Sequence, residues 1–184
     1  MRQSTPVLLF ALLGCAVAPP PAAVTGAIDG RDAFVALCAL AGDWVAAGPE
    51  GSTWLSYRRA ANGSALVEEM RREPGASPLM MSVYHLDGQA LVMTHYCGQG
   101  NQPRMRATEL AAGRIRFDAF EVANLASPAA SRMVRVVFQW RDPERFTQTW
   151  TNRAGDRDDA WSFVFTRVGS TGTAPAAPPA GSGR

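Results

Sequence analysis

Residues 79–106 read LMMSVYHLDGQALVMTHYCGQGNQPRMR, and the dipeptide Asp87-Gly88 divides two runs of alternating apolar residues. An Asp-Gly pair between such runs predicts a β-hairpin with a two-residue turn, in which both central residues take positive φ. A turn at these two residues would set Tyr84 opposite Leu91. The alternation then puts seven side chains on one face. This face suits the wall of a ligand cavity or an ordinary core, and it holds Met80, Ser82, Tyr84, Leu91, Met93, His95 and Cys97.

Short alternating segments continue on both sides of this hairpin, and turn residues such as Asn62-Gly63 and Ala112-Gly113 separate them. A short helix is expected over residues 33–40, with Asp32 as its N-cap. We therefore predict an all-β fold, a closed up-and-down antiparallel β-barrel of about ten strands with a short N-terminal plug helix. The expected strands are 43–47, 53–60, 64–71, 79–86, 89–97, 103–110, 114–122, 132–140, 145–152 and 161–168.

The late strands give the clearest alternation. A three-residue loop after Arg141 would set Trp140 against Phe146 and Val136 against Trp150, with both apolar faces turned inward. The residues expected on these inward faces are Val134, Val136, Phe138, Trp140, Phe146, Gln148 and Trp150, followed on the last strand by Trp161, Phe163, Phe165 and Arg167.

The centre of the chain resembles a bacterial family of lipocalin-like (calycin) β-barrels whose function is mostly unassigned. Three segments carry the resemblance: Tyr84-His85-Leu86-Asp87-Gly88, Thr94-His95-Tyr96-Cys97 and Gly100-Asn101-Gln102-Pro103-Arg104-Met105. The resemblance covers about residues 32–168 and implies a fold more firmly than an activity.

A second resemblance lies at the two ends of the expected barrel. Gly42-Asp43-Trp44 is similar to the G-x-W signature of lipocalins, and Arg167 stands near the end of the last expected strand. The resemblance implies that Arg167 stacks on Trp44 and closes one end of the barrel. An arginine suits this role because its planar cation packs on an indole ring while it donates to nearby carbonyls.

The N-terminus resembles a bacterial lipoprotein signal peptide. Arg2 precedes a short apolar run, and Leu12-Leu13-Gly14-Cys15 resembles a lipobox, in which Cys15 is lipidated. The alternative is an ordinary secretory signal cleaved near Ala18. We expect a signal peptide over residues 1–14, a Pro/Ala-rich tether over 15–31, the barrel over 32–168 and a disordered tail over 169–184. The protein would be anchored in the bacterial cell envelope, at the periplasmic face of the outer membrane by analogy with lipoprotein sorting, since Ala16 follows the cysteine.

Composition argues against nucleic acid as a partner. All 18 basic residues are Arg, they are scattered among 16 acidic residues, and the net charge is +2. No stripe that could follow a phosphate backbone stands out.

The chemistry-bearing residues predict no enzyme, no metal site and no cofactor. His95 and Cys97 share a strand face, but a metal site needs three or four such ligands. No nucleophile, base and oxyanion hole can be assembled, so no catalytic residue is assigned. Some ten-stranded lipocalin-like barrels bind haem through a His, which leaves haem at His95 as a further alternative. Cys38 and Cys97 would be the remaining thiols after lipidation of Cys15, and whether they pair stays open.

The loop Gly98-Gln99-Gly100 leads to three side chains that could hold an anionic head group at the rim of a pocket, namely Asn101, Gln102 and Arg104. Tyr84, Met93 and His95 would line the wall below. The sequence thus predicts an envelope-anchored barrel that binds a small apolar or amphiphilic ligand. A structural or interaction lipoprotein with a filled barrel and no ligand is the alternative.

Replacing Cys15 tests the anchor. Each methylene of an acyl chain in the bilayer contributes about 0.8 kcal/mol, so several chains on one cysteine hold a protein firmly at the surface. The Cys15→Ala variant should therefore leave the membrane fraction and appear in the soluble fraction after cell lysis. Fractionation identical to that of the unaltered protein would rule out lipidation at this residue.

Overall fold

The computed structural model describes residues 27–49 and 51–169. The expected signal peptide, Cys15 and nearly all of the expected tether and tail lie outside these residues. The described part has one α-helix, a short 3-10 turn at Ala61–Gly63 and ten strands. The elements are α1 (Gly30–Cys38), β1 (Gly42–Gly48), β2 (Gly51–Ala60), β3 (Ala65–Arg71), β4 (Met80–Asp87), β5 (Ala90–Tyr96), β6 (Gln102–Ala111), β7 (Arg114–Ala123), β8 (Arg132–Asp142), β9 (Arg145–Ala154) and β10 (Arg157–Arg167).

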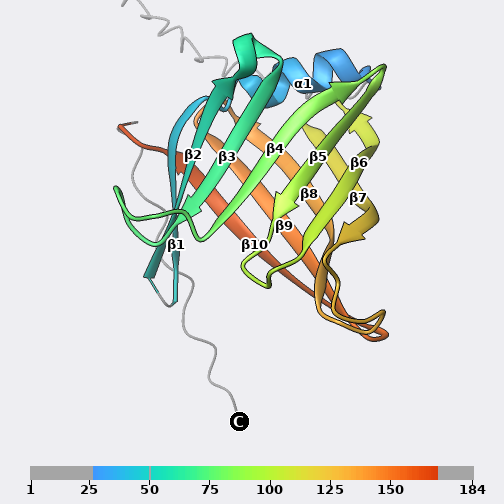
Figure 1. The fold of residues 1–184 in the computed structure, drawn as a ribbon. Helices are drawn as coiled ribbons and strands as arrows, with labels where there is room; N and C mark the ends of the chain where they lie inside the picture. The colour runs from blue at the N-terminus through green and yellow to red at the C-terminus, as the bar shows by residue number, and fades with distance from the viewer. Residues whose placement is uncertain (1–26, 50, 170–184) are drawn as a thin grey trace, which may run out of the picture.

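The strands form a closed antiparallel barrel, as predicted. Each strand pairs with the next in the chain, and β10 pairs with β1 to complete the circle (Figure 1). The helix α1 lies across one end of the barrel, where it contacts β2, β4, β5 and β6. We call the opposite end, where β1, β3, β5, β7 and β9 end, the far end.

The helix begins at Gly30, three residues before its expected first residue. Asp29, and not Asp32, is the N-cap, since its carboxylate accepts a hydrogen bond of 2.8 Å from the backbone N–H of Asp32. An Asp side chain caps a helix that begins at the next residue, so the sequence alone does not distinguish Asp29 from Asp32 as the N-cap. The buried face of α1 comprises Gly30, Ala33, Phe34, Leu37 and Cys38.

The central hairpin has a different register from the one expected, yet the same faces. Asp87 pairs with Ala90, and therefore Tyr84 lies opposite Met93 and not opposite Leu91. Gly88 has φ of 60° and is the first of the two central residues, the place that glycine takes in type II′ turns. The pairing differs from the expected one by two residues, and because side chains alternate with period two, every inward residue stays inward.

Strand β8 departs from strict alternation near its start. In β8, Met133 pairs with Asn152 and Arg135 with Thr151, so Val134 is an extra residue in a β-bulge. The bulge reverses the faces at this end of the strand: Met133 is buried, whereas the expected inward residue Val134 is half-buried. Beyond the bulge the expected pairs, Trp140 with Phe146 and Val136 with Trp150, are present.

The α1 end of the barrel closes around Trp44. Its indole N–H donates to the carbonyl of Leu40 at 2.7 Å, and the Arg167 guanidinium lies over its ring at 4.2 Å from the centroid. Arg167 also donates to the carbonyls of Ala39 and Ala41, at 3.1 Å and 3.0 Å. One cation thus joins the last strand to the first strand and to the end of α1. Gly42, at φ +126°, makes room for it, because a Cβ there would stand 2.9 Å from the guanidinium.

Removing the indole of Trp44 should destabilise the barrel. Trp44 is 1% exposed, and truncation of a buried Trp to Ala costs about 3–5 kcal/mol. We expect Trp44→Ala to lower the free energy of unfolding by this amount in urea titrations. Trp161→Ala is the matched control. Trp161 is 39% exposed, so its truncation should lower the free energy of unfolding much less. Equal unfolding midpoints for the two variants would contradict this account of the closed end.

Candidate functional site

A row of polar side chains crosses the inner face of four neighbouring strands. Tyr57 pairs with Glu68, Glu68 with Ser82, and Ser82 with His95, so the four residues stand side by side from β2 to β5. We call these four residues the polar row. All of them are buried, with at most 2% of any one exposed. Buried polar groups are costly unless they are hydrogen-bonded, so each member of the row needs a partner.

Glu68 is satisfied by neutral donors. Its Oε2 accepts hydrogen bonds from the hydroxyls of Tyr57 at 2.6 Å and Tyr84 at 2.8 Å, and from the amide of Gln148 at 3.0 Å. Gln148 reaches Glu68 from β9, across the barrel, and its own oxygen accepts from the indole N–H of Trp150 at 2.9 Å. Burial raises the pKa of Glu68, and the donors that favour the charged form offset this only in part.

The alternation of β3 already contained the signal for Glu68. Leu66, Glu68 and Met70 alternate with Val67 and Glu69, and the two apolar members of the first set mark the inner face. The burial of Tyr57 follows from the same reasoning on β2. The sequence interpretation treated the acidic residues as dispersed, and it therefore missed these two members of the site.

His95 is the one member of the polar row with an unused hydrogen-bonding atom. Its Nδ1 lies 3.0 Å from the Ser82 hydroxyl, and its ring stands 4.6 Å from the Trp150 ring. Its Nε2 is buried and has no hydrogen-bond partner among the described residues. Burial lowers the pKa of His95 from 6.5 to about 4, so the imidazole is neutral at pH 7. Either tautomer leaves Nε2 as one free donor or acceptor.

Three other buried side-chain atoms of the described chain also lack partners, but they lie elsewhere. Arg145 and Thr166 each adjoin a fully buried Phe in their strands, so they belong to the outer faces of β9 and β10. Asn101 stands in the loop between β5 and β6, where its amide donates to the carbonyl of Ser131 at 2.9 Å while its oxygen is free. Of these four residues, His95 is the one on the inner face of a strand.

A hollow of about 300 Å³ opens at the far end of the barrel. Its lining includes the apolar side chains Met70, Met80, Leu79 and Phe163, together with Arg72. Met70 and Met80 pair with each other across β3 and β4, two residues from Glu68 and Ser82 in the direction of the far end. The two methionines therefore separate this hollow from the polar row. We call Met70 and Met80 the methionine floor. Because methionine has three rotatable bonds and adapts its shape readily, these two side chains can move aside for an entering group.

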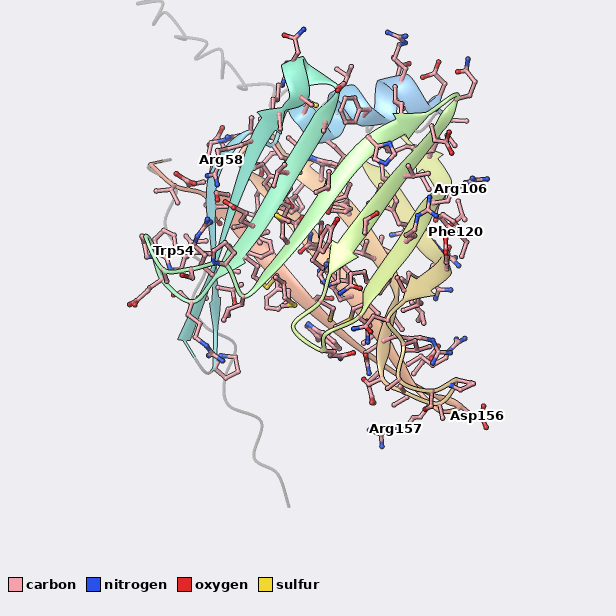
Figure 2. All side chains as sticks on the ribbon, in the orientation of Figure 1. Trp54, Arg58, Arg106, Phe120, Asp156 and Arg157 are labelled. Atoms are coloured by element: carbon pink, nitrogen blue, oxygen red, sulfur yellow. The ribbon has the colours of Figure 1, made fainter. Side chains whose placement is uncertain are left out.

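A larger hollow of about 520 Å³ lies on the outer face of the barrel, where Trp54 and Arg58 project from β2 (Figure 2). Its polar groups are engaged with one another. Arg71 donates to the Ser56 hydroxyl at 2.7 Å and forms an ion pair with Glu69, which also accepts from Arg58. With both of its lining arginines already paired, this hollow has less to offer an anionic group.

The residues expected to form the ligand site fall into two groups. Tyr84, Met93 and His95 are inward and buried, at 0%, 1% and 2% exposure. The expected polar rim does not assemble around them. Asn101 is buried in its loop, and the Gln102 amide donates to the carbonyl of Gly100 at 3.3 Å.

Arg104 lies on the outer face of β6, because its neighbours in the strand, Pro103 and Met105, take the inward positions. It forms an ion pair with Glu121 at 2.6 Å and lies over the ring of Phe120 at 5.1 Å. Figure 2 shows Phe120 and Arg106 on this outer side of the barrel. Arg104 is therefore not placed to meet a ligand beside His95.

The described cysteines and acidic groups form no metal centre. Among the described residues, no three His, Cys, Asp or Glu side chains are grouped to hold a metal ion. Cys38 and Cys97 are both buried free thiols, on α1 and at the far end of β5 respectively.

Haem would need a flat open space against Nε2 of His95. The hollow at the far end does not include His95 in its lining, and Trp150 stands against the imidazole. The residues present therefore do not fit a porphyrin.

Neither a scan against models of known protein families nor a search of curated proteins finds a match for this chain. Within residues 27–49 and 51–169, no helix has the length and apolar character needed to span a membrane. The closed β-barrel is consistent with a non-enzymatic binding or structural protein.

The buried imidazole should make the barrel less stable in acid. The folded pKa of about 4 lies below the ordinary value of 6.5, so between these pH values the unfolded chain binds more protons. Stability should thus fall as the pH drops from about 6.5 to about 4, by up to roughly 3 kcal/mol from this group. Urea unfolding of the unaltered protein and of His95→Gln at several pH values measures this contribution as the difference between the two pH profiles.

Glu68 acts in the opposite direction, because its raised pKa makes the folded state lose stability as the pH rises through that pKa. Both proteins in the comparison retain Glu68, so its contribution cancels to first order. His85→Gln, at the second histidine of the chain, is the control and should keep the acid sensitivity. Parallel pH profiles for the unaltered protein and His95→Gln would disprove the prediction.

Proposed function

We propose that this chain is a lipid-anchored, lipocalin-like barrel of the bacterial envelope that takes a small apolar or amphiphilic ligand through its far end. In this proposal α1 plugs the opposite end and Cys15 holds the protein at the membrane. The observation that supports binding best is the buried Nε2 of His95, which has no partner among the described residues. His95 pairs with Ser82, which stands two residues along β4 from Met80, a residue that lines the hollow.

The two halves of the barrel interior differ in a way that favours this route. Near α1 the interior is filled by fully buried aromatic rings, those of Trp44, Phe117, Phe138, Phe146 and Phe165. Toward the far end the inner face carries the flexible side chains of Met70 and Met80 and the hollow beside them. An apolar tail gains about 25 cal/mol for each Å² that it removes from water, and such a floor accommodates tails of different shapes.

The filled half also supports a second candidate, a structural or interaction lipoprotein with no ligand. In that case the methionines complete the core, and an ordered water satisfies His95 Nε2. The two candidates differ in what filling the hollow with a larger side chain would do, because a barrel without a ligand loses no binding.

Substituting the methionine in the floor tests the proposal. The full-length protein in mild detergent is titrated with a fluorescent fatty-acyl probe that has an uncharged amide head group, and native mass spectrometry checks for co-purified ligand. Met80→Trp should fill the hollow and weaken probe binding at least about tenfold. Met81→Trp is the matched control, because Met81 is the next residue along β4 and pairs with the exposed Tyr96 on the outer face. Circular dichroism verifies that both variants remain folded.

A protein that carries no ligand after purification and binds no probe would instead support the structural role. Equal binding by the Met80 and Met81 variants would place the ligand outside the barrel.

A further inference from the structure

The polar row determines the class and the orientation of the ligand. Resting on the function proposed above, we infer that the ligand enters with its polar group first, that this group is uncharged, and that it hydrogen-bonds Nε2 of His95. A fatty alcohol or amide fits this description, and a fatty acid does not.

The interior has few hydrogen-bond donors left for a ligand. A buried carboxylate needs a cation or several strong donors to replace the water it loses. The strong donors of the interior, Tyr57, Tyr84 and Gln148, already converge on Glu68 Oε2. A second acid beside them would find one free nitrogen, that of His95, which suffices for a hydroxyl or an amide and not for a carboxylate.

The charges of the interior also disfavour an anionic ligand. None of the described arginines is buried, and no ion pair joins Glu68 to a described basic residue. Among the described residues, the interior of the far half therefore holds one acidic side chain, a neutral imidazole and no cation. An anion entering this space would lose its hydration without electrostatic compensation, and it would approach another carboxyl group.

His95 has two ring nitrogens that can form hydrogen bonds, and one of them is already engaged. The Ser82 hydroxyl engages Nδ1, which leaves Nε2, the ring nitrogen farther from the backbone, directed into the barrel. An alcohol can donate to Nε2 or accept from it, so it satisfies either tautomer. The apolar chain of such a ligand would extend back along Met70, Met80 and Phe163 toward the far end.

The opposite orientation makes a distinct prediction. Arg72 is exposed and lines the hollow at the far end. A fatty acid bound with its tail inward would leave its carboxylate near Arg72, where it would remain in contact with water. The affinity for a fatty acid bound in this way would fall on substitution of Arg72 and would not change on substitution of His95. The affinity for a ligand bound with its polar group inward would fall on substitution of His95 and would not change on substitution of Arg72.

Matched ligands of equal chain length separate these cases on the full-length protein in detergent. 1-Dodecanol, dodecanoic acid and dodecylamine compete at pH 7.5 against the fluorescent fatty-acyl probe. We expect dodecanol to bind at least about tenfold more tightly than dodecanoate. His95→Phe should weaken dodecanol binding about tenfold and leave dodecanoate unchanged, and His85→Phe should alter neither.

A second pair of variants tests the role of the buried acid. Glu68→Gln keeps the size of the side chain and removes its charge, so it should narrow the preference for the alcohol over the acid. Glu69→Gln is the matched control, since Glu69 is the next residue along the strand and forms its ion pairs on the outer face.

The outcomes are distinguishable. Dodecanoate binding as tightly as dodecanol, with a loss in Arg72→Ala, overturns the inference and leaves the proposed function in place. Dodecylamine binding more tightly than dodecanol, with a loss in Glu68→Gln, also overturns it, because the preferred group would be a cation. If the probe binds and none of the three competitors displaces it, the inference fails. If the probe itself does not bind, the proposed function fails with it.

Discussion

The pairing of β10 with β1 is the constraint on which the rest of the structure depends. It rests on two residue pairs, Trp44 with Arg167 and Val45 with Thr166. A contact this short closes a ten-stranded sheet because the Arg167 side chain adds its own interactions across the same junction. Its guanidinium covers the Trp44 ring and binds carbonyls at the end of α1. Closure removes both free sheet edges, and with them the unpaired backbone groups that favour aggregation.

Closure also positions the polar interior. Glu68 and Gln148 lie 80 positions apart in the chain, and they meet because the strands return on themselves and bring β9 across from β3. An open sheet would leave the Glu68 carboxyl without its amide donor, and Gln148 would lose its part in holding Trp150 against His95. The hydrogen bonds of the buried acid therefore link the architecture of the barrel to the geometry of the candidate site.

The same linkage is the basis for the kind of ligand that we propose. Glu68 is the one buried acid among the described residues, and the neutral donors that satisfy it leave few strong donors for a second acid. In the proposed complex, Nε2 of His95 meets one hydrogen-bonding group, and Met70 and Met80 pack against an apolar chain. Polarity and shape together describe an uncharged amphiphile, although the outer surface is rich in arginine. Arg104 is an example of these outer arginines, because its guanidinium pairs with Glu121 and lies over the ring of Phe120 on the outer face of the barrel.

The sequence by itself determined the ten strands, the closed barrel and the inward face of the central hairpin, because period-two alternation and turn residues are local properties. It identified Tyr84, Met93 and His95 as inward for the same reason, and it failed at Val134, where a bulge adds a residue that no local pattern reveals. The tertiary structure alone decided which polar groups meet. Which donors reach Glu68, and which side chains pair with Arg104, depends on contacts between strands, such as that of Gln148 on β9 with Glu68 on β3. Those contacts are set by how the barrel closes, and no local periodicity encodes them.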